Sequence, residues 1–282
     1  MRRPGCKRQV PVLMVWCLVL PAAQAVAQQA TAVTGLLDAV QRGQVEIVDL
    51  THELDEQSPY WPEGTTGSPF HAKVVATLQR DGYFARTLEI PEHFGTHLDA
   101  PAHFDSGGKT VDQIPVETLL RPAVVIDVSG EAEKDPNYRL TLADVESWVR
   151  VHGPFPRSCA VLIRTGWGAR WPSQKEYMNQ DAQGVMHFPG LSLEAARYLV
   201  ERASPAALGI DTPSIDYGPS KDFELHRFTM THGLYHLENL VHLGALPATD
   251  ACLVALPMKF RGGSGSPTRV VALVPVAPAS GR

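Results

Sequence analysis

His93-Phe-Gly-Thr-His97-Leu-Asp99-Ala-Pro-Ala-His103 places three histidines and one aspartate within eleven residues of a chain that has eleven histidines in all. Imidazole nitrogen and carboxylate oxygen are the usual donors to Zn²⁺ and Mn²⁺. A single histidine is often only a packed or exposed residue, but four such donors in one short segment favour a shared ion. The segment therefore predicts a metal site.

The spacing of the four donors would place them on one face if the segment were a strand. Residues two, four and six apart in a strand share a face, so alternation would point the four donors the same way. Gly95 lets the chain pass close to a neighbour, and Pro91 and Pro101 indicate an edge, bulge or loop at either end. We therefore do not expect a central strand here.

The N-terminus has the three parts of a secretory signal peptide. Four basic residues lie among the first eight, an apolar run follows from Val10 to Ala23, and small residues precede Gln28. The run is short for a membrane span. We expect residues 1–27 to be removed and residues 28–282 to form one exported domain, periplasmic or secreted, without stable membrane insertion. The Arg2-Arg3 pair fits a twin-arginine signal poorly, so the export route stays open.

Composition excludes some partners. Without the leader the chain has 21 basic and 30 acidic residues, a net charge of −9, which argues against nucleic acid as a partner. At 44% hydrophobic residues the chain can bury a full core. Outside the leader, Cys159 and Cys252 lie in apolar runs, and a disulfide and two free thiols are both open.

Short β-like runs separated by proline and glycine predict one α/β domain. Two helices are expected. Thr141–Val151 starts with a threonine in the N-cap position, and Ser192–Arg202 has Glu194 in its first turn and apolar residues at helical spacing. The segment from Trp167 to Gly190 is interpreted as a long loop, and the Gly-rich 262–267 as a loop without a nucleotide site. The expected strands are Val45–Leu50, His71–Leu78, Phe84–Ile90, Ala123–Val128, Ala160–Arg164, Ala207–Ile210, Cys252–Leu256 and Val270–Val274.

The motif His-x-Gly-Thr-His-x-Asp-x-Pro-x-His resembles the signature of the cyclase-like metal-dependent hydrolases, the family of bacterial kynurenine formamidase and isatin hydrolase. The resemblance implies a swivelling β/β/α-type fold on a closed or barrel-like sheet, assembled as a homodimer or higher homo-oligomer. It extends over nearly the whole mature chain, through 50–54, 60–62, 161–167, 209–216 and 226–240.

The same resemblance implies a metal-ligand set. By it, His93 and His97 hold a first ion, His226 holds a second, and Asp99 and Glu238 bridge both. The number of ions, one or two, stays open. The choice between Zn²⁺ and Mn²⁺ also stays open, because nitrogen and oxygen donors suit either metal.

Three further histidines lie in the segment that contains His226 and Glu238. Each of His232, His236 and His242 is open as a ligand, as a partner of a ligand or as a surface residue.

Two more roles follow from the resemblance. His103 is implied as the general acid/base, with a fifth ligand or a donor to Asp99 as alternatives. Trp61 is implied to line the substrate pocket and stack on a flat ring, although without the resemblance it reads as core. Tyr60, Phe94 and Phe104 are candidates for the same aromatic wall.

Asp211, Ser214 and Asp216 follow a predicted strand. They are open as partners of metal ligands or as ordinary turn residues at a strand end.

The predicted function is a metal-dependent amidohydrolase, of the arylformamidase or isatin hydrolase type. It would cleave a C–N amide bond of a small aromatic amide, linear or cyclic, such as an N-formyl aryl amine or an isatin-like lactam, through metal-activated water. The alternatives are an exported metal- or ligand-binding protein without turnover, and a metal-dependent lyase or dehydratase. His103 favours an enzyme, because binding does not need a proton-transfer group.

Overall fold

The computed structural model describes residues 34–62 and 67–276 of the 282-residue chain. The chain divides into two compact units, 1–45 and 46–282. In the first unit, residues 34–41 are helical. The predicted signal peptide, residues 1–27, lies outside the described residues. Within the described ranges, no helix is long and apolar enough to cross a bilayer.

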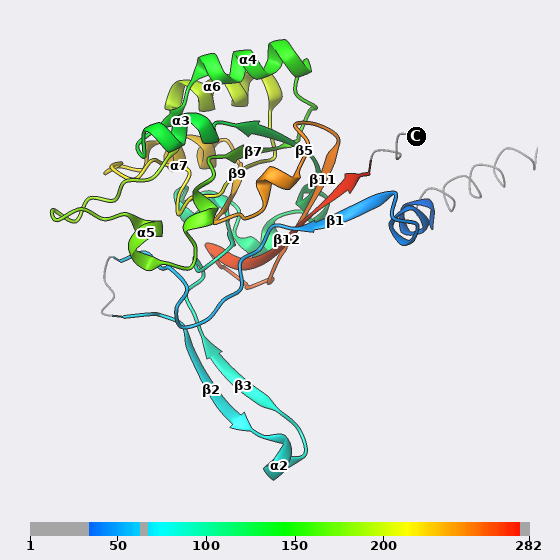
Figure 1. Cartoon of the computed structure of the whole chain (residues 1–282), viewed down its shortest axis with the longest axis vertical. Coiled ribbons are helices and arrows are strands. Elements are labelled where there is room, and N and C mark those ends of the chain that lie inside the picture. The colour runs from blue at the N-terminus through cyan, green and yellow to red at the C-terminus, as the bar shows by residue number, and fades with distance from the viewer. Residues whose placement is uncertain (1–33, 63–66, 277–282) are drawn as a thin grey trace, which may run out of the picture. The chain divides into compact units, whose positions relative to one another are not determined.

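Strands, α-helices and short 3₁₀ helices (η) alternate along the described chain (Figure 1). In order, the elements with printed bounds are β1 (Val45–Asp49), β2 (His71–Ala76), α2 (Leu78–Asp81), β3 (Ala85–Glu89), β4 (His97–Asp99), η1 (Pro101–His103), η2 (Val111–Gln113), η3 (Val116–Leu119), β5 (Leu120–Asp127), α3 (Ser129–Lys134), β6 (Arg139–Leu140), α4 (Leu142–His152), β7 (Ala160–Arg164), η4 (Trp167–Arg170), α5 (Gln174–Met178), β8 (Gly190–Leu191), α6 (Leu193–Ala203), β9 (Ala207–Ile210), α7 (Glu224–Thr231), β10 (Tyr235–Glu238), η5 (Leu243–Ala245), β11 (Ala251–Pro257) and β12 (Gly265–Pro275).

Seven of the described strands close into a barrel. Their hydrogen-bonded order is β12-β11-β5-β7-β9-β10-β4, and β4 also pairs with β12, which closes the ring; β1 lies beside β12. The strands β5, β7, β9 and β10 run parallel, and the pairings that involve β4, β11 and β12 within the ring are antiparallel. This arrangement confirms the predicted α/β class with a closed sheet.

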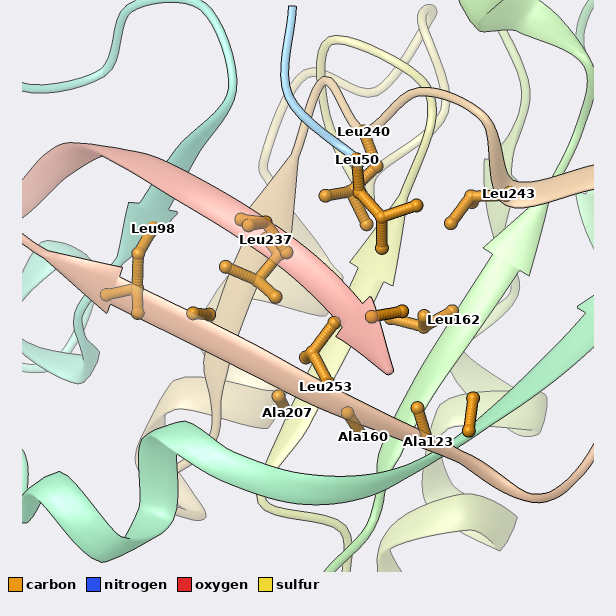
Figure 2. Packing of buried hydrophobic residues seen from close by; sticks show 14 of the residues in the cluster. Leu50, Leu98, Ala123, Ala160, Leu162, Ala207, Leu237, Leu240, Leu243 and Leu253 are labelled. Atoms are coloured by element: carbon orange, nitrogen blue, oxygen red, sulfur yellow. The ribbon is translucent and has the colours of Figure 1, made fainter. Parts of the chain in front are cut away.

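Both faces of the parallel strands are buried, because successive side chains alternate between the barrel interior and the surrounding helices. Ala123, Ala160 and Ala207 lie opposite one another and point inward. Their small side chains leave room for leucines such as Leu237 and Leu253 (Figure 2). The residues that follow these alanines belong to a second core beneath the helices: Val124, Val161 and Leu208.

Two helices, α4 and α6, cover that outer core side by side (Figure 1). Both predicted helices are confirmed, and α4 begins directly after its predicted cap, Thr141. Thr141 accepts a hydrogen bond from the backbone N–H of Asp144, and Ser192 accepts one from Ala195. Each bond satisfies an N–H group that the first turn leaves without a helical partner.

The interpretation of 167–190 as a long loop is wrong in part. The segment contains η4 and α5, and its large side chains form a small buried core with Trp61 and Trp171 packed against it. Trp167 Nε1 donates to the carbonyl of Tyr177 at 2.7 Å, which joins the two short helices. Aromatic residues spaced without a period explain why periodicity did not reveal this core. Its members are Trp167, Tyr177, Met178, Met186 and Phe188.

The Gly-rich loop is also shorter than predicted. Strand β12 already begins at Gly265, where it pairs with Asp99 of β4. A Cβ at Gly265 would lie 2.4 Å from Cε1 of His93, so only glycine allows this close approach.

Strands β2 and β3 form a separate two-stranded arm that extends away from the barrel, with α2 at its tip (Figure 1). Val74 and Leu88 lie on one face of the arm and are 49% and 54% exposed. At its tip, Leu78, Tyr83 and Phe84 are also exposed. The arm thus carries apolar side chains that the described residues leave uncovered.

Candidate metal centre

The pairing of β4 with β10 builds the centre. The two strands are antiparallel, with His97 opposite Glu238 and Asp99 opposite His236. Side chains directly opposite on one face lie close together. The intervening Leu98 and Leu237 point into the barrel core, so the four polar side chains share the opposite face.

Residues 93–103 do not form one continuous strand, so simple alternation is not what aligns the four donors. Gly95 has a φ of +63°, which ends the extended backbone before β4, and His103 lies in η1. The prediction against a central strand is wrong, because the three-residue β4 lies between β10 and β12. The four donors nevertheless converge, because the turn at Gly95 and the helix η1 bring His93 and His103 back beside β4.

His93 and His97 each direct a ring nitrogen at Asp99. His93 Nδ1 lies 2.5 Å from Asp99 Oδ1, and His97 Nε2 lies 3.0 Å from the same oxygen. The other nitrogen of His97 donates to the carbonyl of Gly95 at 2.9 Å. In His93, Nε2 lies 2.9 Å from the hydroxyl of Ser264. That hydroxyl donates to Glu92, so it accepts the N–H of His93.

His226 approaches from α7 on the other side of the two carboxylates. Its Nε2 lies 3.5 Å from Asp99 Oδ2 and 3.3 Å from Glu238 Oε1. Its Nδ1 lies 2.6 Å from a carboxylate oxygen of Asp216, which accepts the ring N–H. Asp216 also accepts the backbone N–H groups of Leu225 and His226, so it fixes the start of α7 as well. This contact supports the interpretation of Asp216 as a partner of a proposed metal ligand, not as an ordinary turn residue.

The electrostatics of the cluster favour a cation. Burial alone would lower the pKa of His97, but the Asp99 and Glu238 charges raise it to about 9. Burial raises the pKa of Glu238, and Asp99 adds to the effect. Burial acts in the same direction on Asp99, but His97 and His93 outweigh it and hold its pKa well below the usual range. Two carboxylates buried this close together need positive charge between them.

The donor set fits a divalent metal. Two groups of potential ligand atoms each lie within 4.8 Å of one another, and Asp99 belongs to both: His93, His97 and Asp99 in one, and Asp99, His226, His236 and Glu238 in the other. Every predicted ligand is therefore in the cluster, and it contains one more histidine than the resemblance implies.

A cavity of about 270 Å³ opens beside the cluster. Its wall is aromatic on one side, where Trp61 lies 6.0 Å from Phe223 and Phe104 lies 5.4 Å from Phe223, measured between ring centroids. Tyr60 also lines the cavity, whereas Phe94 is buried against Phe70 and does not. The sequence reasoning missed Phe223, which carried no recognisable signal.

His103 lines the same cavity at the edge of the cluster. Its ring stacks on that of His93, with centroids 3.9 Å apart, and lies 6.0 Å from His226. Burial lowers the pKa of His103 to about 4, although Asp99 opposes the shift. The ring is therefore neutral near neutral pH and is able to accept a proton.

Several other candidates lie outside the cluster. His232 and His242 are exposed, and their Nδ1 atoms bond to the carbonyls of Phe228 and Asp49. Asp211 accepts hydrogen bonds from Thr165 and Gly166, as expected of a strand-end residue. Cys159 and Cys252 are both free thiols.

The sequence of residues 48–217 matches the Cyclase family, described as "Putative cyclase". The chain belongs to this family. The match covers the strand and loop residues that contribute His93, His97 and Asp99, and it ends before α7.

Relatives and solved structures agree with this assignment. An isatin hydrolase from Roseibium aggregatum is 32% identical over 88% of this chain and 98% of its own length. A kynurenine formamidase from Bacillus cereus is 30% identical over 80% of this chain and 96% of its own. The crystal structure of an isatin hydrolase bound to the product analogue thioisatinate has a TM-score of 0.82 at 30% identity, and covers 88% of this chain and 99% of that one.

Replacing Asp216 by Asn should weaken metal binding. The substitution removes the charge that holds the His226 ring N–H while it keeps the side-chain shape. Loss of such a partner typically lowers metal affinity by about 10- to 100-fold. Zn²⁺ affinity measured by chelator competition tests this, with the exposed Asp222→Asn as the matched control. Equal affinity in Asp216→Asn and the unsubstituted protein would contradict the role of Asp216.

Proposed function

We propose that this protein is a metal-dependent hydrolase that cleaves the C–N amide bond of a small aromatic amide, linear or cyclic. The observation that carries the proposal is the buried histidine–carboxylate cluster, which borders a cavity with an aromatic wall and a neutral histidine at its edge. Relatives over most of this chain include an isatin hydrolase and kynurenine formamidases. Isatin-like lactams and N-formyl aryl amines are therefore the proposed substrate classes.

The proposed ligands are those of the cluster. His93, His97 and Asp99 would hold one ion of Zn²⁺ or Mn²⁺, and His226 a second, with Asp99 and Glu238 between the two. A bound divalent metal lowers the pKa of water from about 16 toward 7 and polarises a carbonyl oxygen. The ring N–H groups of all three histidines are held by protein acceptors, so the metal-facing nitrogens keep their direction.

His103 is the proposed general acid/base. It lines the cavity, stacks on His93 and lies outside both groups of potential ligand atoms. A neutral imidazole in this position takes a proton from the attacking water and then delivers it to the departing nitrogen. The amine thus leaves in neutral form and the carbonyl carbon becomes a carboxylate.

Trp61 is the proposed surface on which the substrate ring lies. It forms the aromatic wall together with Phe104 and Phe223. Flat apolar rings favour contact with an aromatic ring, and a cavity of about 270 Å³ suits a substrate of one or two rings.

The substitutions His97→Ala and His103→Ala should have separate effects. His97→Ala removes a proposed ligand, so the variant should lose metal and activity together. His103→Ala should keep its metal and lose about 10²- to 10⁴-fold in kcat, because a positioned acid/base contributes that much. Metal content by elemental analysis, with isatin and an N-formyl aryl amine as substrates, measures both effects. Full metal content and full rate in His97→Ala would refute the site, and unchanged kcat in His103→Ala would refute the role of His103 as the general acid/base.

We propose further that the protein is a homodimer or higher homo-oligomer, with the β2–β3 arm in the interface. An isolated two-stranded hairpin is only marginally stable in water, and this one exposes apolar side chains on one face and at its tip. A second copy of the chain would cover those side chains.

Leu88→Glu should therefore dissociate the oligomer, because it places a charge in the apolar face of the arm. Thr87→Glu is the matched control, because Thr87 is an exposed neighbour on the opposite face. Light scattering coupled to size exclusion gives the mass of each variant. A monomeric unsubstituted protein, or a Leu88→Glu variant of unchanged mass, would contradict the proposal.

The export of the chain, with removal of residues 1–27 and a periplasmic or secreted destination, also remains our proposal. Its support is the order of basic, apolar and small residues in the leader.

A further inference from the structure

We propose that His236 is an additional metal ligand, which completes a four-donor position with Asp99, His226 and Glu238. The inference rests on the proposed metal-dependent function and goes beyond it, because the ligand set implied by the family resemblance does not contain this residue. His236 lies on β10, opposite Asp99 in the β4–β10 pairing, and its side chain is fully buried.

The hydrogen bonds of His236 determine which ring nitrogen carries the proton. Nε2 lies 2.7 Å from the hydroxyl of Thr229. That hydroxyl has one proton and donates it to the carbonyl of Leu225 at 2.6 Å. It must therefore accept the N–H of His236, which leaves Nδ1 with a free lone pair.

This lone pair points at the metal centre. His236 Nδ1 lies 3.9 Å from Asp99 Oδ2, and both atoms are buried without a hydrogen bond to any described residue. Two buried acceptors that face each other are unfavourable unless a cation or a hydrogen-bond donor lies between them, and a divalent cation would bind both. A proton on Nδ1 does not resolve this, because 3.9 Å is too long for a hydrogen bond.

The spacing of the four donors fits one ion. Ligands about 2.0–2.2 Å from a tetrahedral Zn²⁺ lie about 3.3–3.6 Å from one another. The observed separations are 3.3 Å between His226 Nε2 and Glu238 Oε1, 3.5 Å between His226 Nε2 and Asp99 Oδ2, and 3.9 Å for His236. All four ligand atoms lie within 4.8 Å of one another.

His236 also follows the pattern of the three proposed histidine ligands. In each of them, one nitrogen gives its proton to a protein acceptor and the other faces the carboxylates. Thr229 accepts the ring N–H of His236, just as Asp216 accepts the ring N–H of His226. Orientation of a ligating histidine through its second nitrogen is the rule in metal sites.

Asp99 and Glu238 are proposed to lie between the two ions, so both positions would share these carboxylates. The first position would add His93 and His97, and the second would add His226 and His236. With His236, each position would thus have two histidine donors.

The test is the Zn²⁺ content of His236→Gln after loading with Zn²⁺ alone and dialysis. Glutamine places its amide NH₂ near the position of Nε2, where it is able to donate a hydrogen bond to Thr229. It has no atom at the position of Nδ1 that could bind a metal. We expect this variant to hold one equivalent fewer than the unsubstituted protein. His236→Asn, which places an oxygen near Nδ1, should recover that equivalent at least in part. His232→Gln is the matched control on the same segment, because His232 is exposed, and it should keep the full content.

The outcomes separate the two levels of the proposal. An unsubstituted protein that binds no Zn²⁺ would overturn the proposed function and this inference with it. An unsubstituted protein that binds Zn²⁺, with His236→Gln equal to it in content and in resistance to a chelator, would overturn only the role of His236. Circular dichroism establishes that the compared variants are folded. If His236→Gln does not fold, the Zn²⁺ content of His236→Asn is compared with that of His236→Ala, which has no atom near Nδ1.

Discussion

The centre depends on the antiparallel pairing of β4 with β10. That pairing places His97 beside Glu238 and Asp99 beside His236 on one face, while Leu98 and Leu237 anchor the other face in the barrel core. A shift of the pairing by one residue would exchange the two faces. The charged side chains would then lie in the barrel core, where the leucines now lie. Closure of the barrel through β4 is therefore also what brings the proposed metal ligands together.

Around this pairing, the protein fixes each histidine through the nitrogen that does not face the carboxylates. The acceptors come from different parts of the chain, among them the carbonyl of Gly95, the hydroxyl of Ser264 on the approach to β12, and Asp216 after β9. Such anchoring sets the donor directions before any metal binds, which favours tight and selective binding. The contacts of Asp216 also connect the segment after β9 to the start of α7.

Much of this was predictable from local signals. The donors clustered at 93–103, the bounds of β7 and β9, and the capped helices α4 and α6 all agree with the sequence reasoning. Other features depend on non-local contacts. Helix α7 has no capping residue at its own start, where Phe223 has a φ of +52°; the distant Asp216 accepts its first N–H groups instead. Nothing in the sequence fixes the β4–β10 register that singles out His236 among its neighbouring histidines.

The most direct test of a metal centre is anomalous X-ray diffraction at the zinc absorption edge, on crystals of the protein grown with Zn²⁺. The account predicts an anomalous peak within bonding distance of both Asp99 and His97 or of both Asp99 and His226. Crystals saturated with Zn²⁺ that give no peak at Asp99 would contradict it, because the buried carboxylates would then be balanced by protons alone.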